Sequence, residues 1–511
     1  MSQVLVNRDP RTDIRSESDI AQVVDVGGQR LSISRNPSVN YSATQDRISY
    51  ATWTINPPSN QTIIGREFRI TYYIVVKTDI PIIEGVYDCL RQFPVSSLID
   101  NINFKVNGSA QVSKRCGDLL HAEMSFSNEC EDRRKAFMTP SYPDQFGQLA
   151  DGYGLNRNPA VLFGENVNEP SRYVEYVEAN EDLTEIRYKV TEPVFISPLL
   201  DGVGSPDEGL VNVNEIFLQL FFKTRQDRIL TCMNRDAQGL NNITNVTVGF
   251  YEAPELVLTY ITPNMMDMIP AVQVLPYVEP DFHRKIQNME FARNVETRVE
   301  SETYRIGQVP KMLMIYLPRT ETEATFDKPD SFLEILSCKI QWNNENSLLT
   351  MANQEELYQM SRRNGCNMSF HQWRTRGSVL MLHFGTDLGL PDGLSPSTVG
   401  SFNLKVELQV RNSHMEDNVR CDLCTVLYNQ GSFVIAQNTG RVSLGSLTPS
   451  MVLSAEKAEQ LEHHEHPAKV QGHGLLSSIR GMIPKKKHHR ASPMEQPKAP
   501  EPRKIGGSLR R

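Results

Sequence analysis

Two stretches of the sequence decide the fold. Leu98–Glu123 reads LIDNINFKVNGSAQVSKRCGDLLHAE and Leu336–Ser361 reads LSCKIQWNNENSLLTMANQEELYQMS. Each contains an alternating apolar run, a polar Asn-rich turn and a short helical run. The alternation predicts a strand, because successive side chains of a strand point to opposite faces. Ile102 matches Ile340 at a spacing of 238 residues, so the two stretches follow one design.

A second match appears at a shorter spacing. The run Phe217-Leu-Gln-Leu-Phe221 resembles Leu404-Lys-Val-Glu-Leu408, at a spacing of 187 residues. One internal duplication explains both spacings if the first copy carries an insert between its matching segments. The insert is expected near 130–185, which is rich in Pro, Gly, Asn and charged residues. The sequence therefore predicts two related domains, with a long loop in the first.

The periodicity between these landmarks is that of strands. In Phe402–Arg411, apolar and polar residues alternate without a break, which predicts one face on a core and one face in water. Before residue 450, short helices are expected at 115–125 and 352–362. Strands are expected at 68–76, 99–107, 185–197, 216–223, 245–251, 255–262, 311–317, 334–342, 378–384, 402–410 and 422–436. Many short strands and few helices predict an all-β chain of two tandem eight-stranded jelly-roll sandwiches.

The boundaries follow from changes in composition. Residues 1–45 are expected to form an irregular N-terminal arm, 46–265 the first jelly roll, 266–445 the second, and 446–511 a flexible basic tail. The halves are expected to meet around 262–295. Four prolines in that stretch argue against any regular element; they are Pro263, Pro270, Pro276 and Pro280.

Composition and charge narrow the classes of function. The 511 residues are 39% hydrophobic and carry a net charge of −8, which is ordinary for a globular protein. No window approaches the roughly 18 apolar residues of a membrane span, and the polar N-terminus lacks the features of a secretory signal. The positive charge is concentrated after Lys469, so residues 1–468 are strongly acidic. Any contact with nucleic acid is therefore expected in the tail.

Catalytic and metal-binding patterns give little support to an enzyme. Cys421-Asp-Leu-Cys424 has the spacing of metal ligands but lacks a second ligand pair, so buried thiols are favoured. His463, His464 and His466 are expected to lie in a solvated linker, and the acidic cluster Glu129–Asp132 on the surface. No catalytic residue, cofactor or metal ion is therefore expected.

The tail contains two candidate contact sites. A helix is expected to begin at Thr448, and a second, amphipathic one at Gly474–Ile483. The apolar face of the second is a candidate for docking on a neighbouring subunit, with a membrane surface or a free tail as alternatives; it consists of Leu475, Leu476, Ile479, Met482 and Ile483. The basic cluster is a candidate for nuclear import or nucleic-acid contact, with a solubilising disordered tail as the alternative; it consists of Lys485, Lys486, Lys487 and Arg490.

The arrangement of the repeats, together with Phe93–Val112, FPVSSLIDNINFKVNGSAQV, resembles the double jelly-roll major capsid proteins of the adenovirus-like, Polinton-like and virophage lineage of DNA viruses. The resemblance covers about 45–440. It implies a homotrimer whose six sandwiches form a pseudo-hexagonal capsomer, with the 130–185 insert as an outer tower. It also implies a capsid lattice of such trimers, with penton and minor capsid proteins as partners. This chain is far shorter than adenovirus hexons and differs from them in its basic tail.

The leading hypothesis is thus a structural one, a major capsid protein of an icosahedral virion. The expected location is the virion, and the host nucleus or cytoplasm during assembly, without secretion. One alternative is a single jelly-roll capsid protein with a projecting β-domain from a small ssDNA or RNA virus. Another is a non-viral tandem β-sandwich that binds carbohydrate, or a glycosidase on such a fold, which would need two carboxylates about 5–9.5 Å apart.

Overall fold

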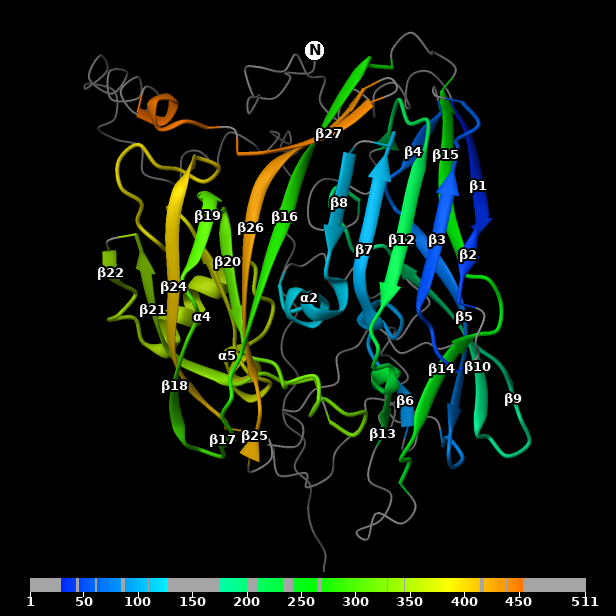
Figure 1. Ribbon diagram of the computed structural model, residues 1–511, viewed down its shortest axis with the longest axis horizontal. Coiled ribbons are helices and arrows are strands. Elements are labelled where there is room, and N and C mark those ends of the chain that lie inside the picture. The colour runs from blue at the N-terminus through cyan, green and yellow to red at the C-terminus, as the bar shows by residue number, and fades with distance from the viewer. Residues whose placement is uncertain are drawn as a thin grey trace, which may run out of the picture. The chain divides into compact units, whose positions relative to one another are not determined.

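Antiparallel strands dominate the computed structural model and form two sandwiches that follow each other along the chain (Figure 1). The structure describes residues 29–42, 46–59, 62–83, 88–108, 110–126, 175–199, 209–232, 242–263, 269–328, 330–343, 345–413, 418–436, 439–445 and 447–453. All of these residues belong to one unit, Met1–Leu453. No helix in these ranges is both long and apolar enough to span a membrane.

The first sandwich pairs an eight-stranded sheet with a five-stranded sheet. The order in the larger sheet is β11 (Gly209–Leu210), β4 (Ile63–Gly65), β15 (Glu255–Pro263), β5 (Arg69–Thr78), β10 (Glu185–Pro193) and β9 (Glu175–Ala179), with β1 (Gln29–Pro37) on β15 and β14 (Val246–Phe250) on β5. The order in the smaller sheet is β2 (Asn40–Tyr41), β3 (Tyr50–Ile55), β12 (Ile216–Phe222), β7 (Ile99–Val106) and β8 (Ala110–Lys114). A short ribbon joins β6 (Asp88–Leu90) and β13 (Leu230–Cys232).

The second sandwich consists of two five-stranded sheets. One contains β16 (Val272–Ile286), β26 (Asp422–Ala436), β20 (Met312–Tyr316) and β23 (Val379–His383), with β27 (Thr439–Leu444) on β26. The other contains β18 (Glu296–Glu300), β24 (Val399–Arg411), β21 (Glu334–Trp342) and β22 (Glu345–Leu348), with β19 (Tyr304–Gln308) on β24. A short ribbon joins β17 (Phe291–Ala292) and β25 (Asn418–Val419).

The duplicated stretches occupy equivalent places in the two sandwiches. In the first, the hairpin β7–β8 leads into helix α2 (Cys116–Glu123), and in the second, β21–β22 leads into helix α4 (Gln354–Arg363). Ile102 on β7 pairs with β12, and Ile340 on β21 pairs with β24. The second copy adds the short helix α5 (Phe370–Thr375). The predicted all-β tandem sandwich, with short helices between strands, is confirmed.

Three expectations from the sequence need correction. The prolines of 262–295 do not exclude regular structure, because Pro276 and Pro280 lie inside the 15-residue strand β16. In the sheet order β16 lies at an edge, where the missing N–H of proline removes no ladder hydrogen bond. The arm expected to be irregular contains β1, which pairs with β15 along its whole length. The C-terminal end of the expected insert forms β9, which pairs with β10.

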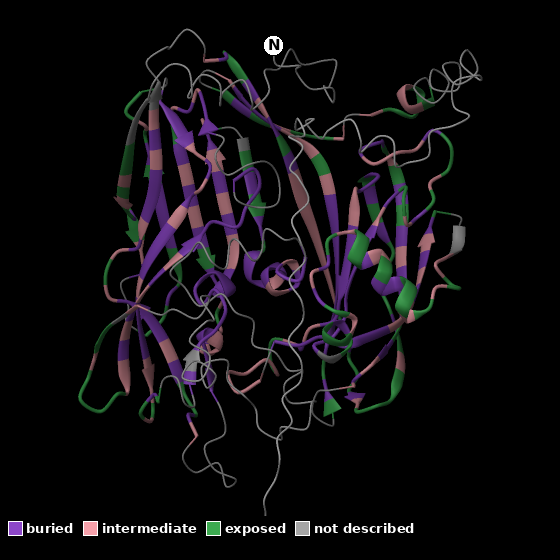
Figure 2. Ribbon diagram, turned by 180° about the vertical axis from the view of Figure 1, so that it is seen from behind, coloured by how far each residue is buried: buried purple, intermediate pink, exposed green. Residues whose placement is uncertain are grey.

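Each sandwich has its own apolar core, seen as the buried strand interiors in Figure 2. Trp53 and Phe104 lie in the first core, and Trp342 and Trp373 in the second. The strand alternation explains this, since β7 buries every second side chain from Ile102 to Val106.

The helix expected from Thr448 is present at its start. Met451 N–H donates to Thr448 Oγ1 at 3.4 Å, and the structure describes this helix as far as residue 453.

Candidate functional site

Helix α2 joins the two sandwiches by contributing to both cores (Figure 1). Cys116 and Leu120 pack in the first core, whereas Leu119 and Ala122 pack in the second. These residues lie on different faces of the helix, because side chains share a face at spacings of three or four. A helix that is apolar on two sides must be covered on two sides. Its sequence, CGDLLHAE, therefore fixes the helix between the two sandwiches.

Strands β16 and β26 of the second sandwich also contribute to this junction. Tyr277 and Phe433 on these strands pack in the core of the first sandwich, although both strands belong to a sheet of the second. The Phe433 ring stacks on the Phe104 ring with centroids 6.5 Å apart. Aromatic pairs at 4.5–7 Å are stabilising beyond the area they bury. The cores are thus interlocked, so the two sandwiches cannot rotate freely against each other.

A buried ion cluster at Asp330 adds polar contacts to this junction. The Asp330 carboxylate from the second sandwich accepts from Arg91 Nη1 at 3.4 Å and from Arg228 Nη2, both in the first. His121 on α2 lies close by, with its Nδ1 atom 3.8 Å from Asp330 Oδ2. Burial favours the protonated carboxyl, yet the surrounding positive charges outweigh it and hold the pKa of Asp330 far below its usual value.

The protonation of His121 follows from the same surroundings. Burial lowers the pKa of His121 to about 4, against the opposing charge of Asp330. The imidazole is therefore neutral near pH 7. We accordingly attribute the ionisation of Asp330 to Arg91 and Arg228, which are charged at every relevant pH.

Further hydrogen bonds connect the two sandwiches through residues outside the Asp330 cluster. Arg225 Nη1 donates to the backbone oxygens of Glu321 and Thr322 at 2.6 and 2.9 Å. Asn107 Nδ2 donates to the backbone oxygen of Ala436 at 3.2 Å. Tyr428 Oη donates to Glu123 Oε1 at 2.9 Å. The contacts of Asn107 and Tyr428 are partly buried, so a change in the orientation of the two sandwiches would leave these donors without their acceptors.

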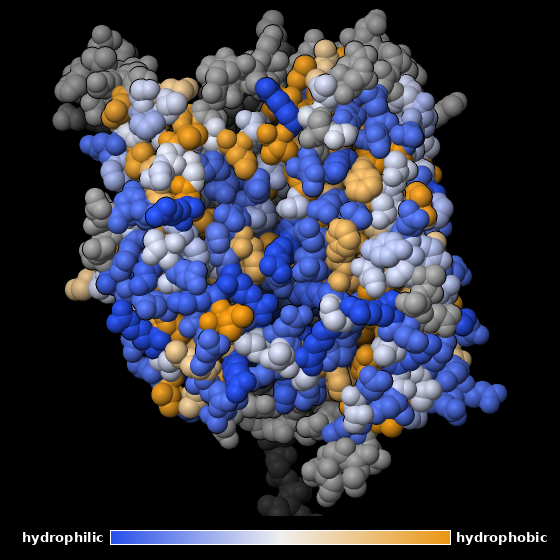
Figure 3. Space-filling model, in the orientation of Figure 1, coloured by the Kyte–Doolittle hydropathy of each residue, from blue (hydrophilic) through white to orange (hydrophobic). Residues whose placement is uncertain are grey.

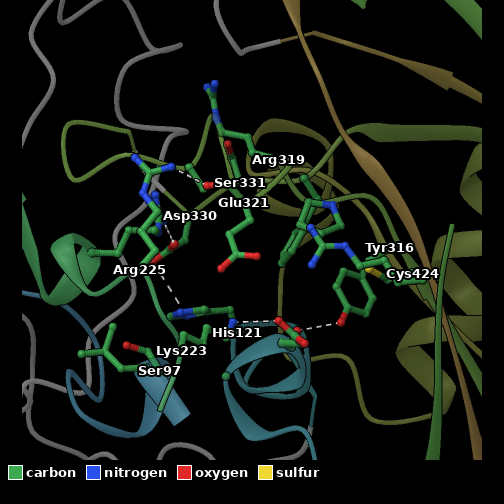
Figure 4. Close-up of a pocket in the computed structure, with 18 of the residues that line it drawn as sticks. Ser97, His121, Lys223, Arg225, Tyr316, Arg319, Glu321, Asp330, Ser331 and Cys424 are labelled. Carbon is green, nitrogen blue, oxygen red and sulfur yellow. Dashed lines mark hydrogen bonds and ion pairs between the residues drawn. The ribbon is translucent and has the colours of Figure 1, made fainter. Parts of the chain in front are cut away.

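A cavity of about 140 Å³ lies at this junction. Figure 4 shows Glu321 reaching into it, with His121 and Tyr316 on opposite sides and Arg319 at the far end from His121. The lining is rich in cations from both sandwiches; they are Arg91, Lys223, Arg225, Arg228, Arg284 and Arg319. Its carboxylates are Asp118, Glu321 and Asp330.

The cysteine pair singled out by its spacing consists of free, buried thiols. Cys421 and Cys424 both lie within the second core. Burial raises the pKa of each thiol far above its usual value, which keeps the sulfur protonated and a poor metal ligand. In the described part of the chain, no group of three His, Cys, Asp or Glu side chains is placed to hold a metal ion.

The candidate site residues expected from the sequence differ from those that the structure brings together at the junction. The basic cluster at 485–490, the apolar face at 475–483, the histidines at 463–466 and the acidic cluster at 129–132 all lie outside the described residues. Conversely, no sequence pattern indicated the ion cluster of Arg91, Arg228 and Asp330. They come from distant parts of the chain, and the only local signal is that Arg91 directly follows the apolar end of β6.

The outer surface carries aromatic and aliphatic side chains that remain partly exposed in the described structure. Tyr50 on β3 and Phe221 on β12 are direct cross-strand partners, 40% and 38% exposed. Ile33 and Val39 nearby along the chain are 61% and 62% exposed. Elsewhere, the face seen in Figure 3 is mainly hydrophilic, with hydrophobic side chains in small separate groups.

Two capsid-protein families match the sequence. The family model for the first domain of the Sputnik virophage major capsid protein matches residues 1–174. The model for the C-terminal domain of major capsid protein V20 matches 280–376 and 370–431. The two models thus match the two halves of the duplicated chain. Both halves of the chain are therefore similar to virophage major capsid proteins. The double jelly-roll resemblance expected from Phe93–Val112 and the repeats is confirmed.

Relatives agree over almost the full length. The chain is 24% identical to the "Putative capsid protein V20" of Sputnik virophage, an alignment that covers 94% of this chain and 86% of the relative. The Sputnik capsid protein fold, determined by cryo-EM, superposes with a TM-score of 0.75 at 23% identity, over 94% of this chain and 98% of that one. The mavirus major capsid protein gives 0.64 at 13% identity, over 83% and 92%. Homology to virophage major capsid proteins over both halves supports a structural role in a virion shell.

Proposed function

We propose that three copies of this capsid protein form a homotrimeric capsomer with a pseudo-hexagonal outline, and that such capsomers tile an icosahedral shell. The observation that carries the proposal is the interlocked junction. Helix α2 packs in both cores, and Phe433 of the second sandwich packs in the first. Two sandwiches held in one fixed orientation supply two similar blocks per chain, so a closed three-fold ring contains six.

The exposed apolar side chains support a subunit contact. Obligate interfaces bury thousands of Å² and are more apolar than ordinary surface. The cross-strand pair Tyr50 and Phe221 offers aromatic area on the outer side of a rigid sheet, where little side-chain entropy is lost on binding. Ile33 on β1 and Val39 before β2 are further exposed apolar side chains of the first sandwich. We assign these residues to the contact between neighbouring copies.

The expectations for the tail and its partners remain proposals. The basic cluster Lys485, Lys486, Lys487 and Arg490 would contact packaged nucleic acid or direct nuclear import. The apolar face 475–483 would dock beneath a neighbouring subunit. Penton and minor capsid proteins would complete the shell. Two jelly rolls that divide near residue 265, the first of them including β1, and a tail from residue 446 are proposed on the same grounds, as is the absence of enzymatic activity.

The molar mass in solution tests the trimer. Light scattering of the purified protein should give three times the chain mass of 57.9 kDa. Replacing Phe221 by a charged residue (Phe221→Glu) should shift the mass towards the monomer without unfolding the chain, because the side chain lies on the outer face. Leu444→Glu offers a matched control, since Leu444 is similarly exposed at 37% but lies on β27. A stable wild-type monomer at micromolar concentration would refute the proposal.

A further inference from the structure

The cavity at the junction contains one cation that differs from its neighbours. The other cations of the lining each have a carboxylate partner: Arg91 and Arg228 pair with Asp330, Lys223 with Asp118, Arg225 with Asp227, and Arg284 with Asp422. For Arg319, the described residues provide no such partner. Among the described residues, none supplies a hydrogen-bond acceptor to its buried Nε and Nη2 atoms, and Arg319 is only 7% exposed.

An unpaired buried guanidinium is costly, because a charge removed from water needs a compensating charge or hydrogen bonds. The two unsatisfied donors of Arg319 lie on one edge of its planar fork. That edge is the one with which arginine binds the two oxygens of a carboxylate, phosphate or sulfate in a bidentate manner. The geometry therefore leaves an oxyanion-binding edge open.

A further unsatisfied donor comes from the adjacent segment. Pro318 forms an antiparallel bridge with Phe332, which brings Arg319 opposite Ser331 on the adjacent segment. Ser331 is 5% exposed, and its Oγ atom is buried without a partner in the described structure. Both residues line the same cavity (Figure 4). A hydroxyl and a guanidinium edge together can satisfy three oxygen contacts of a single anion.

We propose that this cavity binds one small tetrahedral oxyanion of the phosphate or sulfate class, held by the Arg319 fork and the Ser331 hydroxyl. A site for one water molecule requires about 10–15 Å³, so a cavity of about 140 Å³ accommodates such an anion but not a nucleoside in addition. Glu321 shares the cavity and repels the anion. Its side chain is exposed, so solvent screening weakens that repulsion.

The bound anion would stabilise the junction between the sandwiches. Its two contact residues belong to the second sandwich, while Lys223, Arg225 and Arg228 of the first line the same cavity and add attraction. A ligand that binds the folded chain and not the unfolded one raises the stability by mass action. This inference is independent of trimer formation, so its failure would leave the proposed capsomer untouched.

Isothermal titration calorimetry and thermal unfolding with inorganic phosphate test the site. At constant ionic strength set by chloride, the wild-type protein should bind one phosphate per chain, and its Tm should rise and then saturate. Arg319→Gln should weaken binding by about tenfold or more, because it removes two charge-assisted hydrogen bonds. Arg305→Gln is the matched control; Arg305 is exposed on β19, and its loss should leave binding unchanged.

Two milder variants keep the test valid if Arg319→Gln fails to fold. Ser331→Ala removes a single donor and should weaken phosphate binding by about tenfold, whereas Glu321→Gln should strengthen it. An absence of phosphate binding to the wild type would overturn the proposal. So would a non-saturating Tm rise of equal size in all variants, which is the general effect of a kosmotropic salt.

Discussion

Arg91 Nη1 lies 3.4 Å from Asp330 Oδ2, and this buried contact joins residues 239 positions apart in the sequence. Arg91 belongs to the first sandwich and Asp330 to the second. Asp330 is buried among cations, so its contacts with them lie inside the junction and differ from surface ion pairs. Its removal should therefore be costly.

Replacing this carboxylate tests the ion cluster. Asp330→Asn leaves the buried Arg91 and the partly buried Arg228 without their counter-charge, and breaking a buried ion pair typically costs about 3–5 kcal/mol. Denaturant unfolding should show a midpoint shifted by about that free energy. Asp392→Asn, at an exposed position, should change stability by no more than about 0.5 kcal/mol. Equal effects of the two changes would contradict the role assigned to Asp330.

The neutral imidazole of His121 predicts a specific pH dependence. Its pKa is about 4 in the folded chain and about 6.5 when unfolded. Below pH 6.5 the unfolded state therefore binds more protons than the folded state, and stability falls as the pH drops towards 4. The pKa difference corresponds to at most about 3 kcal/mol. Asp330 stays ionised over this window, since its pKa lies far lower.

The comparison that isolates this effect is between the wild type and His121→Gln. The variant lacks the titrating ring, so its stability should depend less on pH between 6.5 and 4. Urea unfolding at closely spaced pH values measures the difference in slope. Identical pH profiles for both proteins would show that His121 does not titrate as argued.

The close approach of α2 to the first sandwich depends on a glycine. A Cβ atom at Gly117 would lie 2.3 Å from the backbone oxygen of Ser97 and 2.7 Å from that of Ile99. Gly117→Ala should therefore displace the helix and destabilise the protein by about 1–3 kcal/mol, as overpacking does. Gly307→Ala is the control, because no atom lies within 4 Å of a Cβ there. Thermal unfolding of both variants checks the prediction.

The tail should be separable from the folded body. Deleting 470–511 removes both the apolar face 475–483 and the basic cluster 485–490, yet the junction and both cores lie before residue 454. Trimers should persist, while nuclear entry or particle assembly changes. Light scattering and microscopy of labelled protein measure the two outcomes. If the truncated chain failed to fold, the tail could not be regarded as an appendage.

The strands could be predicted from sequence because their signal is local. The alternation in Phe402–Arg411 depends only on neighbouring residues, and this run forms part of strand β24. Ile102 and Ile340 each lie in such an alternating run, and the two runs form strands in equivalent places of the two sandwiches. The same local reasoning failed for β16, because the cost of a proline depends on whether the strand lies at an edge. That position is a property of the sheet and not of the segment.

The junction could not be predicted in this way. Asp330, Arg91 and Arg228 come together only after both sandwiches have folded, and none lies in a periodic pattern. Helix α2 gave a partial signal, since its apolar residues are spread over two faces. A helix covered on both sides has that composition, but the sequence alone does not say which two bodies cover it.

Electron cryo-microscopy of the purified protein decides whether two interlocked sandwiches per chain build a three-fold capsomer. We expect particles with three chains and six sandwich densities in a pseudo-hexagonal ring, with α2 buried between the two sandwiches of each chain. Particles in which the two sandwiches of one chain adopt variable orientations, or rings without three-fold symmetry, would contradict this expectation.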